Sequence, residues 1–144
     1  MTDVLVDLLR TYFKWIDIGC RVAKNSKHDA IAAYHSFGKD SVLILIDIEK
    51  PFKEALETLR IFKERGVPRI SLTTIPLSRI GIMSSLVIPL RVERRYLIPP
   101  MAPFAAVIDL LVMKIANLRK KEAEGKMKYL ERVRGDKELI SLNV

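Results

Sequence analysis

The chain has 144 residues, the size of one ordinary domain, and 49% of them are hydrophobic. This apolar fraction excludes a chain that is disordered by composition, because disordered chains combine high charge with low hydrophobicity. Lys and Arg number 25 against 17 Asp and Glu, giving a net charge of +8, so a nucleic-acid or membrane-surface partner stays open until the charge is located.

The first third of the chain predicts helices and short apolar strands in alternation. Apolar residues at helical spacing predict a helix over 2–17, which Gly19 ends. Residues 20–23 are predicted as a short buried strand, in which Cys20 is a small buried side chain. Residues 27–37 are predicted as a second helix. The run of five apolar residues at 42–46 predicts a strand buried on both faces, as in a parallel sheet covered by helices.

The middle of the chain continues the alternation. A third helix has Pro51 in its first turn, where the missing N–H costs nothing, and ends at Gly66. Strands are predicted at 69–73 and 86–88, with a short helical turn over 76–83 between them.

The last part of the chain is predicted to be helical. Residues 89–103 contain four prolines and are predicted as an irregular connection. A long apolar helix follows over 103–118, then a charged helix over 120–133, and 135–144 are predicted as a loosely held tail.

Strands that alternate with helices through short loops imply right-handed crossovers and a parallel sheet. We therefore predict an α/β fold, a three-layer doubly wound sheet of about four parallel strands in a single domain over 1–144. Its parts are an N-terminal helix (1–18), a βα core (19–90), an irregular connection (91–102) and C-terminal helices (103–134).

The positive charge is concentrated in the C-terminal quarter, where acidic residues interleave with it as on a solvated helix face. Tyr129 is the one aromatic residue there that could stack on a base, so we expect no nucleic-acid partner. No apolar run approaches the ~18–20 residues of a membrane span, and no secretory leader is recognisable. We expect a cytoplasmic protein with no metal, no cofactor and no membrane association. The 29% charged fraction hints at a thermophilic source.

The order and spacing of these elements resemble a sugar-isomerase (SIS) domain, the phosphosugar-binding α/β fold, and in particular the effector domain of RpiR-type transcription regulators. The resemblance covers most of the chain and is a pattern of strands and helix ends. The matching stretches are 18–22, 41–66, 70–77, 105–111 and 130–134.

The resemblance implies two phosphate-holding loops, and both depart from the family pattern. The first strand and the glycine-rich loop after it have no counterpart in this sequence. The second loop usually reads Ser-x-Ser-Gly-x-Thr, but a gapless alignment on residues 53–57 places Asp47, Ile48, Glu49, Lys50, Pro51 and Phe52 there. Two carboxylates would repel a phosphate by about 1 kcal/mol each at 4 Å in water and about 4 at an effective dielectric constant of 20.

Asp47 and Glu49 have several interpretations. Acidic residues before a helix complement its dipole and cap its free N–H groups, which requires no function. The alternatives are an acidic site for a cation or an amine, and general acid–base work by the pair.

Three further groups are candidates. His28 and His35 share a helix face and, with Glu49, are the only catalytic candidates. The alternative interpretation is that the two histidines are exposed on their helix and have no function. Thr73, Thr74 and Ser78 follow a strand, where doubly wound folds place ligands, or are turn residues. An arginine cluster in the irregular connection could contact an anion or a partner, or be solvated. The candidate ligand-binding residues are Asp47, Glu49, Lys50, Thr73, Thr74, Ser78, Arg91, Arg94 and Arg95.

Three functions follow as hypotheses. The leading one is a degenerate, non-catalytic SIS-like binding or interaction module. The second is an effector domain that senses a sugar phosphate or another small anion, and the third is a phosphosugar (aldose–ketose) isomerase. The apolar helix over 103–118 predicts a homodimer or larger assembly, because it is apolar on more than one face.

Overall fold

The structure is a computed structural model that describes residues 2–23, 27–48, 53–92 and 100–141. It contains a sheet of three strands: β1 (Leu43–Asp47), β2 (Arg69–Thr73) and β3 (Leu86–Pro89). The strands lie in the order β1-β2-β3 and are all parallel. The central row of the sheet pairs Ile44 with Ile70 and Ile70 with Leu86.

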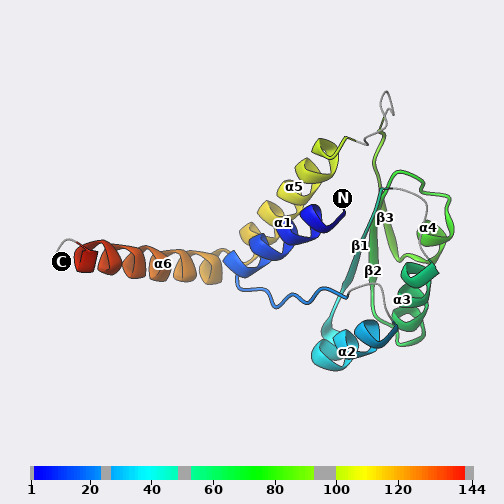
Figure 1. Cartoon of the computed structure of the whole chain (residues 1–144), viewed down its shortest axis with the longest axis horizontal. Helices are drawn as coiled ribbons and strands as arrows, with labels where there is room; N and C mark the ends of the chain where they lie inside the picture. Colours follow the sequence, from blue (N-terminus) through cyan, green and yellow to red (C-terminus); the bar gives the residue numbers. More distant parts are fainter. Residues whose placement is uncertain (1, 24–26, 49–52, 93–99, 142–144) are drawn as a thin grey trace.

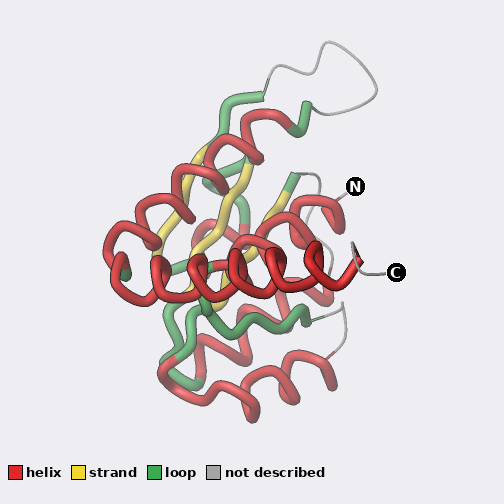
Figure 2. The backbone as a smooth tube through the Cα atoms, turned by 90° about the vertical axis from the view of Figure 1, so that its left-hand side faces the viewer, coloured by secondary structure: helices red, strands yellow, loops and turns green. Residues whose placement is uncertain are grey.

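The described residues form six α-helices, and five of them lie on the two faces of the sheet, so the fold is three-layered and doubly wound (Figures 1 and 2). One layer contains α1 (Thr2–Trp15) and α5 (Ala102–Leu118), and the other contains α2 (Lys27–Phe37), α3 (Lys53–Glu64) and the short α4 (Arg79–Met83). A 3-10 turn (Gly38–Asp40) leads from α2 into β1. The last helix, α6 (Lys120–Ser141), projects away from the sheet.

The main core lies between the sheet and the layer of α1 and α5. Apolar residues three or four apart on α1 and α5 meet the even-numbered residues of β1 and β2 there. The buried members of this core are Leu5, Leu9, Phe13, Ile16, Ile48, Leu72, Leu90, Phe104, Ile108 and Val112. Burial of such a stripe is the main stabilising term of an amphipathic helix, since propensity alone contributes little.

A smaller core lies on the opposite face, between α2 and α3. Ala30 and Ala33 of α2 pack with Phe62 of α3 and with Val67, just before β2. The ring of Tyr34 stands edge-on to Phe62 with the centroids 6.2 Å apart. Leu43 packs against this cluster from the start of β1, so α2 lies beside the amino ends of the strands.

Several predictions are confirmed, and the physical signals behind them are local. The α/β class, the parallel sheet and the helices over 27–37 and 103–118 agree with the structure within one residue. Gly66 ends α3 with a φ of 71°, the left-handed backbone that glycine adopts without a steric cost.

Four predictions are wrong. Residues 20–23 do not form a strand, because they pair with no described strand and a strand exists only through such pairing. The described residues therefore form a sheet of three strands, where about four were predicted. Cys20 is exposed. The first helix ends at Trp15, before Asp17 takes a left-handed φ of 58°, and Gly19 plays no part in this. The expected tail at 135–144 is helical as far as Ser141.

Candidate functional site

The carboxyl ends of the three parallel strands meet at one edge of the sheet, where doubly wound folds place their ligands. Asp47 ends β1 and Thr73 ends β2, and the two are partners in the register of the sheet. Asp47 is 7% exposed and Thr73 is fully buried. The chain that follows β3 begins at the same edge, where the backbone N–H of Leu90 donates to the carbonyl of Thr73 at 2.9 Å.

The side chains of Asp47 and Thr73 are bonded to each other. The Thr73 hydroxyl donates to Oδ2 of Asp47 at 3.0 Å, and its oxygen accepts from the backbone N–H of Ile75 at 3.0 Å. Burial raises the pKa of the Asp47 carboxyl, and the hydrogen bond from Thr73 opposes part of that rise. The Thr73 hydroxyl thus holds its neighbours in place and has little capacity left for a ligand.

Thr74 ties the same edge together on the next residue. Its backbone N–H donates to the carbonyl of Asp47 at 3.3 Å, and its hydroxyl donates to the carbonyl of Ile48 at 3.3 Å. Its side chain is half-buried. A carboxylate and two hydroxyls are therefore gathered within a few residues of two strand ends, as the spacing of the sequence predicts.

Ser78 serves as a helix cap. Its hydroxyl oxygen accepts from the backbone N–H of Gly81 at 3.4 Å, at the start of α4. The chain can fold back this tightly because residue 81 is a glycine: an added Cβ would lie 2.8 Å from the carbonyl carbon of Pro76 and closer still to its oxygen. Gly81 is thus a positioning residue for the loop beside Thr74, which the sequence analysis did not single out.

The remaining candidates do not gather at this edge. His28 and His35 are exposed on α2, which lies beside the amino ends of the strands, so the structure separates them from Asp47. Arg91 is exposed and lies two residues after the end of β3, hence on the side of the carboxyl edge. Glu49, Lys50, Arg94 and Arg95 lie outside the described residues.

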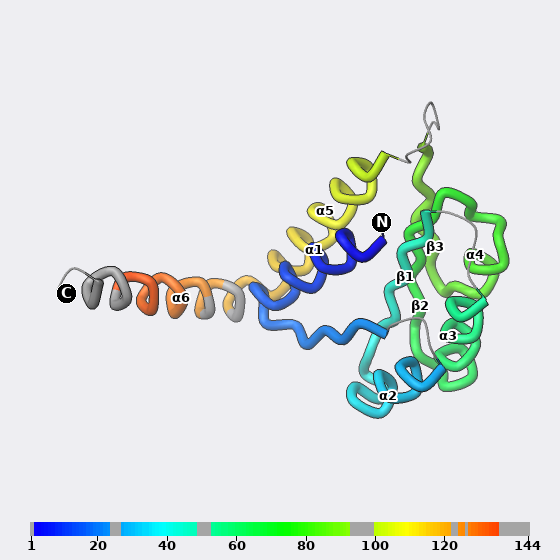
Figure 3. Tube along the Cα trace, viewed as in Figure 1, coloured from blue at the N-terminus to red at the C-terminus, as the bar shows by residue number. Residues whose placement is uncertain are grey.

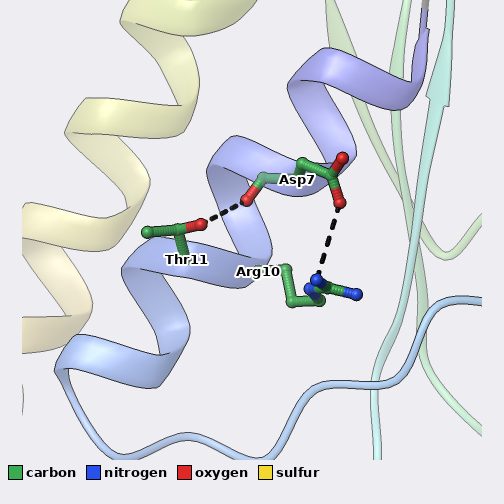
Figure 4. A network of polar contacts seen from close by, with 3 residues as sticks. All are labelled: Asp7, Arg10 and Thr11. Atoms are coloured by element: carbon green, nitrogen blue, oxygen red, sulfur yellow. Dashed lines mark hydrogen bonds and ion pairs between the residues drawn. The ribbon is translucent and has the colours of Figure 1, made fainter.

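Two open hollows on the described surface lie away from this edge. One of about 430 Å³ is lined by Arg10, Lys14 and residues 17–20, between the end of α1 and the chain that follows it. Arg10 lies 4.0 Å from the Asp7 carboxylate, one turn earlier on α1, where the Thr11 hydroxyl also donates to the Asp7 carbonyl at 2.8 Å (Figure 4). The other hollow lies at the junction of α5 and α6. The residues that line these two hollows form no motif that the sequence alone would indicate.

Two of the expectations, that there is no metal site and no membrane association, can be compared with the structure only for the residues that it describes. There, no three His, Cys, Asp or Glu side chains lie close enough together to hold a metal ion. None of the described helices combines the length and the apolarity that a membrane crossing requires.

The layer order, the parallel sheet and the polar carboxyl edge define a SIS-like α/β fold, and comparison with known proteins agrees. Neither a protein-family profile nor a curated protein sequence matches this chain. Solved structures do match. The sugar-isomerase domain of an RpiR transcription factor from Sphaerobacter thermophilus superposes with a TM-score of 0.79 at 17% identity, over 90% of this chain and 72% of that one.

Two further structures have the same fold. The Vibrio vulnificus NanR protein, solved in complex with ManNAc-6P, matches with a TM-score of 0.73 at 14% identity over 92% of this chain. A protein described as a phosphosugar isomerase from Salmonella typhimurium LT2 matches with a TM-score of 0.60 at 21% identity over 80% of this chain. The chain spans 51% of the NanR chain and 35% of the isomerase chain. The fold is thus SIS-like and similar to that of RpiR-type regulators.

Proposed function

We propose that residues 1–144 form one SIS-like module that binds a partner without catalysing a reaction. The observation that carries this proposal is the bonded pair at the carboxyl edge. Asp47 occupies the position of the first serine of the phosphate loop in the family that the sequence resembles. Its buried carboxyl accepts the hydrogen bond that the Thr73 hydroxyl donates. A phosphate there would meet a carboxylate in place of hydroxyl donors, and like charges at close range repel.

Isothermal titration calorimetry with a panel of hexose and pentose phosphates, ManNAc-6P included, tests this proposal. We expect no saturable heat in the micromolar range. Saturable micromolar binding would contradict a module without a phosphate site. The Asp47→Ser variant is the informative companion, because it restores the hydroxyl of the family pattern at this position, and a gain of binding in that variant alone would identify the carboxylate as the cause.

The second candidate is an effector domain that still binds a sugar phosphate, in a different arrangement. Its support is the NanR structure in complex with ManNAc-6P, together with the half-buried hydroxyl of Thr74 and the exposed guanidinium of Arg91 on the side of the same edge. If this candidate is correct, Arg91→Ala weakens the binding that calorimetry detects. The position of His28 disfavours an isomerase, because His28 lies beside the amino ends of the strands, whereas Asp47 lies at their carboxyl ends.

We propose that the module is a homo-oligomer and that α5 contributes to the contact with a second copy. The inner side of α5 is buried through Phe104, Ile108 and Val112, while Leu110 and Met113, one turn apart, are 66% and 61% exposed. Large apolar side chains that adjoin on an exposed helix face are typical of an interaction surface.

Light scattering measures this directly. We expect a species larger than 16.5 kDa at micromolar concentration, and we expect Met113→Glu to reduce its mass. Lys114→Glu is the matched control, because it adds the same carboxylate at the neighbouring exposed position of α5. A species of 16.5 kDa alone, at all concentrations, would refute the assembly.

A further inference from the structure

The sheet ends at β1 with a strand edge that no described strand covers. In the order β1-β2-β3, β1 pairs with a strand on one side only among the residues that the structure describes. The N–H of Leu43 donates to the carbonyl of Pro68, and the carbonyl of Asp47 accepts from Thr74. Successive residues of a strand direct their peptide groups to opposite sides, so the odd-numbered residues of β1 bond to β2. The N–H and C=O groups of Ile44 and Ile46 therefore point away from β2, to the open side of β1. Figure 3 shows the course of the β1 backbone in the sheet.

This edge lacks the features that protect an edge strand. Residues 43–46 are all apolar, with no Lys, no Pro and no charge that would discourage another strand from pairing. The opposite edge differs, because β3 is shorter and ends in Pro89, which has no N–H to offer. Val42, next to β1, is 52% exposed, and the strand itself is only partly buried as far as Ile46.

We infer that the open edge of β1 pairs with β1 of a second copy of this chain, antiparallel across a two-fold axis at Leu45. The geometry of the hydrogen bonds favours this occupant. In that register Ile44 faces Ile46 of the other copy, and both direct their N–H and C=O groups outward, so each such pair exchanges two hydrogen bonds. The two-fold axis generates a second, equivalent pair of Ile46 with Ile44 of the other copy, so the two strands share four hydrogen bonds.

The same register preserves the two faces of the sheet. Residues that face each other across an antiparallel pair project their side chains to the same face. Ile44 and Ile46 belong to the core beneath α1 and α5, so that apolar layer continues from one copy into the other. A two-fold contact of this kind is self-complementary and closes as a dimer with a sheet of six strands. It involves a surface different from the exposed face of α5.

Amide hydrogen exchange resolved to single residues tests the pairing on the unmodified chain. We expect the N–H groups of Ile44 and Ile46 to be protected at submillimolar concentration and to lose protection on dilution, while that of Leu45 stays protected because it bonds to β2. Fast exchange at Ile44 and Ile46 at every concentration would overturn the inference and leave the edge to a different partner. Protection that persists in a 16.5 kDa species would also overturn it, because the chain would then cover its own edge.

A matched pair of variants gives the second measurement. Val42→Lys adds a charge beside the β1 edge, whereas Leu86→Lys adds the same charge at the β3 edge, on the same sheet face and at a similar exposure of 54%. Light scattering should show that Val42→Lys lowers the mass of the assembly by half and that Leu86→Lys does not. If both variants keep the mass and only Met113→Glu lowers it, the contact is on α5 alone and the β1 pairing is refuted.

Discussion

Gly81 gives the most direct test of how the loop beside the candidate site is built. In Gly81→Ala the new methyl group overlaps the backbone carbonyl of Pro76, which is not the end of a flexible side chain and can yield only if the loop from Thr74 to Ser78 moves. Overpacking of this kind costs about 1–3 kcal/mol. The preference of a helix for Ala over Gly recovers at most about 1 kcal/mol, so the free energy of unfolding should fall by about 1–2 kcal/mol.

Urea unfolding followed by circular dichroism measures this change. With a denaturant slope of about 1–3 kcal/mol/M for a small domain, the midpoint should fall by roughly 1 M. Gly125→Ala is the control, because Gly125 is exposed within α6 and a Cβ there has nothing within 4 Å. That variant should gain about 0.5–1 kcal/mol from the reduced backbone freedom of the unfolded chain. An unchanged midpoint in Gly81→Ala would refute the close approach of Pro76.

Three further predictions concern buried or paired polar groups. Ser71→Ala should raise the free energy of unfolding by about 1 kcal/mol in urea unfolding, because the fully buried Ser71 hydroxyl has no hydrogen-bond partner among the described residues and such a group costs about 1–3 kcal/mol. Asp47→Asn should gain stability relative to the unmodified chain as the pH rises above about 4, as urea unfolding across the pH range will show. Asp109→Asn should lower the raised pKa of Tyr12, measured by ultraviolet titration of the phenol, since the Asp109 carboxylate accepts its hydrogen bond.

The sign of the Asp47 prediction follows from the direction of its pKa. Burial raises the pKa of the folded carboxyl above that of the unfolded chain, so the folded state holds its proton more tightly. This contribution to stability is present below the unfolded pKa and is lost as the pH rises through the folded pKa. An amide does not titrate, so the Asp47→Asn variant carries no such loss. A difference between the two proteins that is constant with pH would contradict the raised pKa.

Tyr12 behaves in the same sense at alkaline pH. Hydrogen bonding with the Asp109 carboxylate raises its pKa, so this contribution to stability is present below the ordinary pKa of tyrosine and is lost as the phenol ionises. A Tyr12 pKa that does not move in the variant would refute the hydrogen bond.

The sequence by itself determined the elements whose signals are local. The apolar run at 42–46 predicts a buried strand, and the 3.6-residue periodicity of 103–118 predicts a helix with a buried face. Gly66 indicates where the helix before it ends. These predictions required no knowledge of distant residues. The same patterns placed Asp47 and Thr73 at neighbouring strand ends, because parallel strands bring their carboxyl ends to one edge.

Only the tertiary structure decided what depends on a neighbour far away in the chain. Three of the four residues at 20–23 are apolar, yet a strand needs a partner for its peptide groups, and this stretch pairs with none of the described strands. The use of the Thr73 hydroxyl by Asp47, the tight approach of Gly81 to Pro76 and the separation of His28 from the carboxyl edge are set by how the layers meet. These contacts are properties of packing, which local periodicity does not encode.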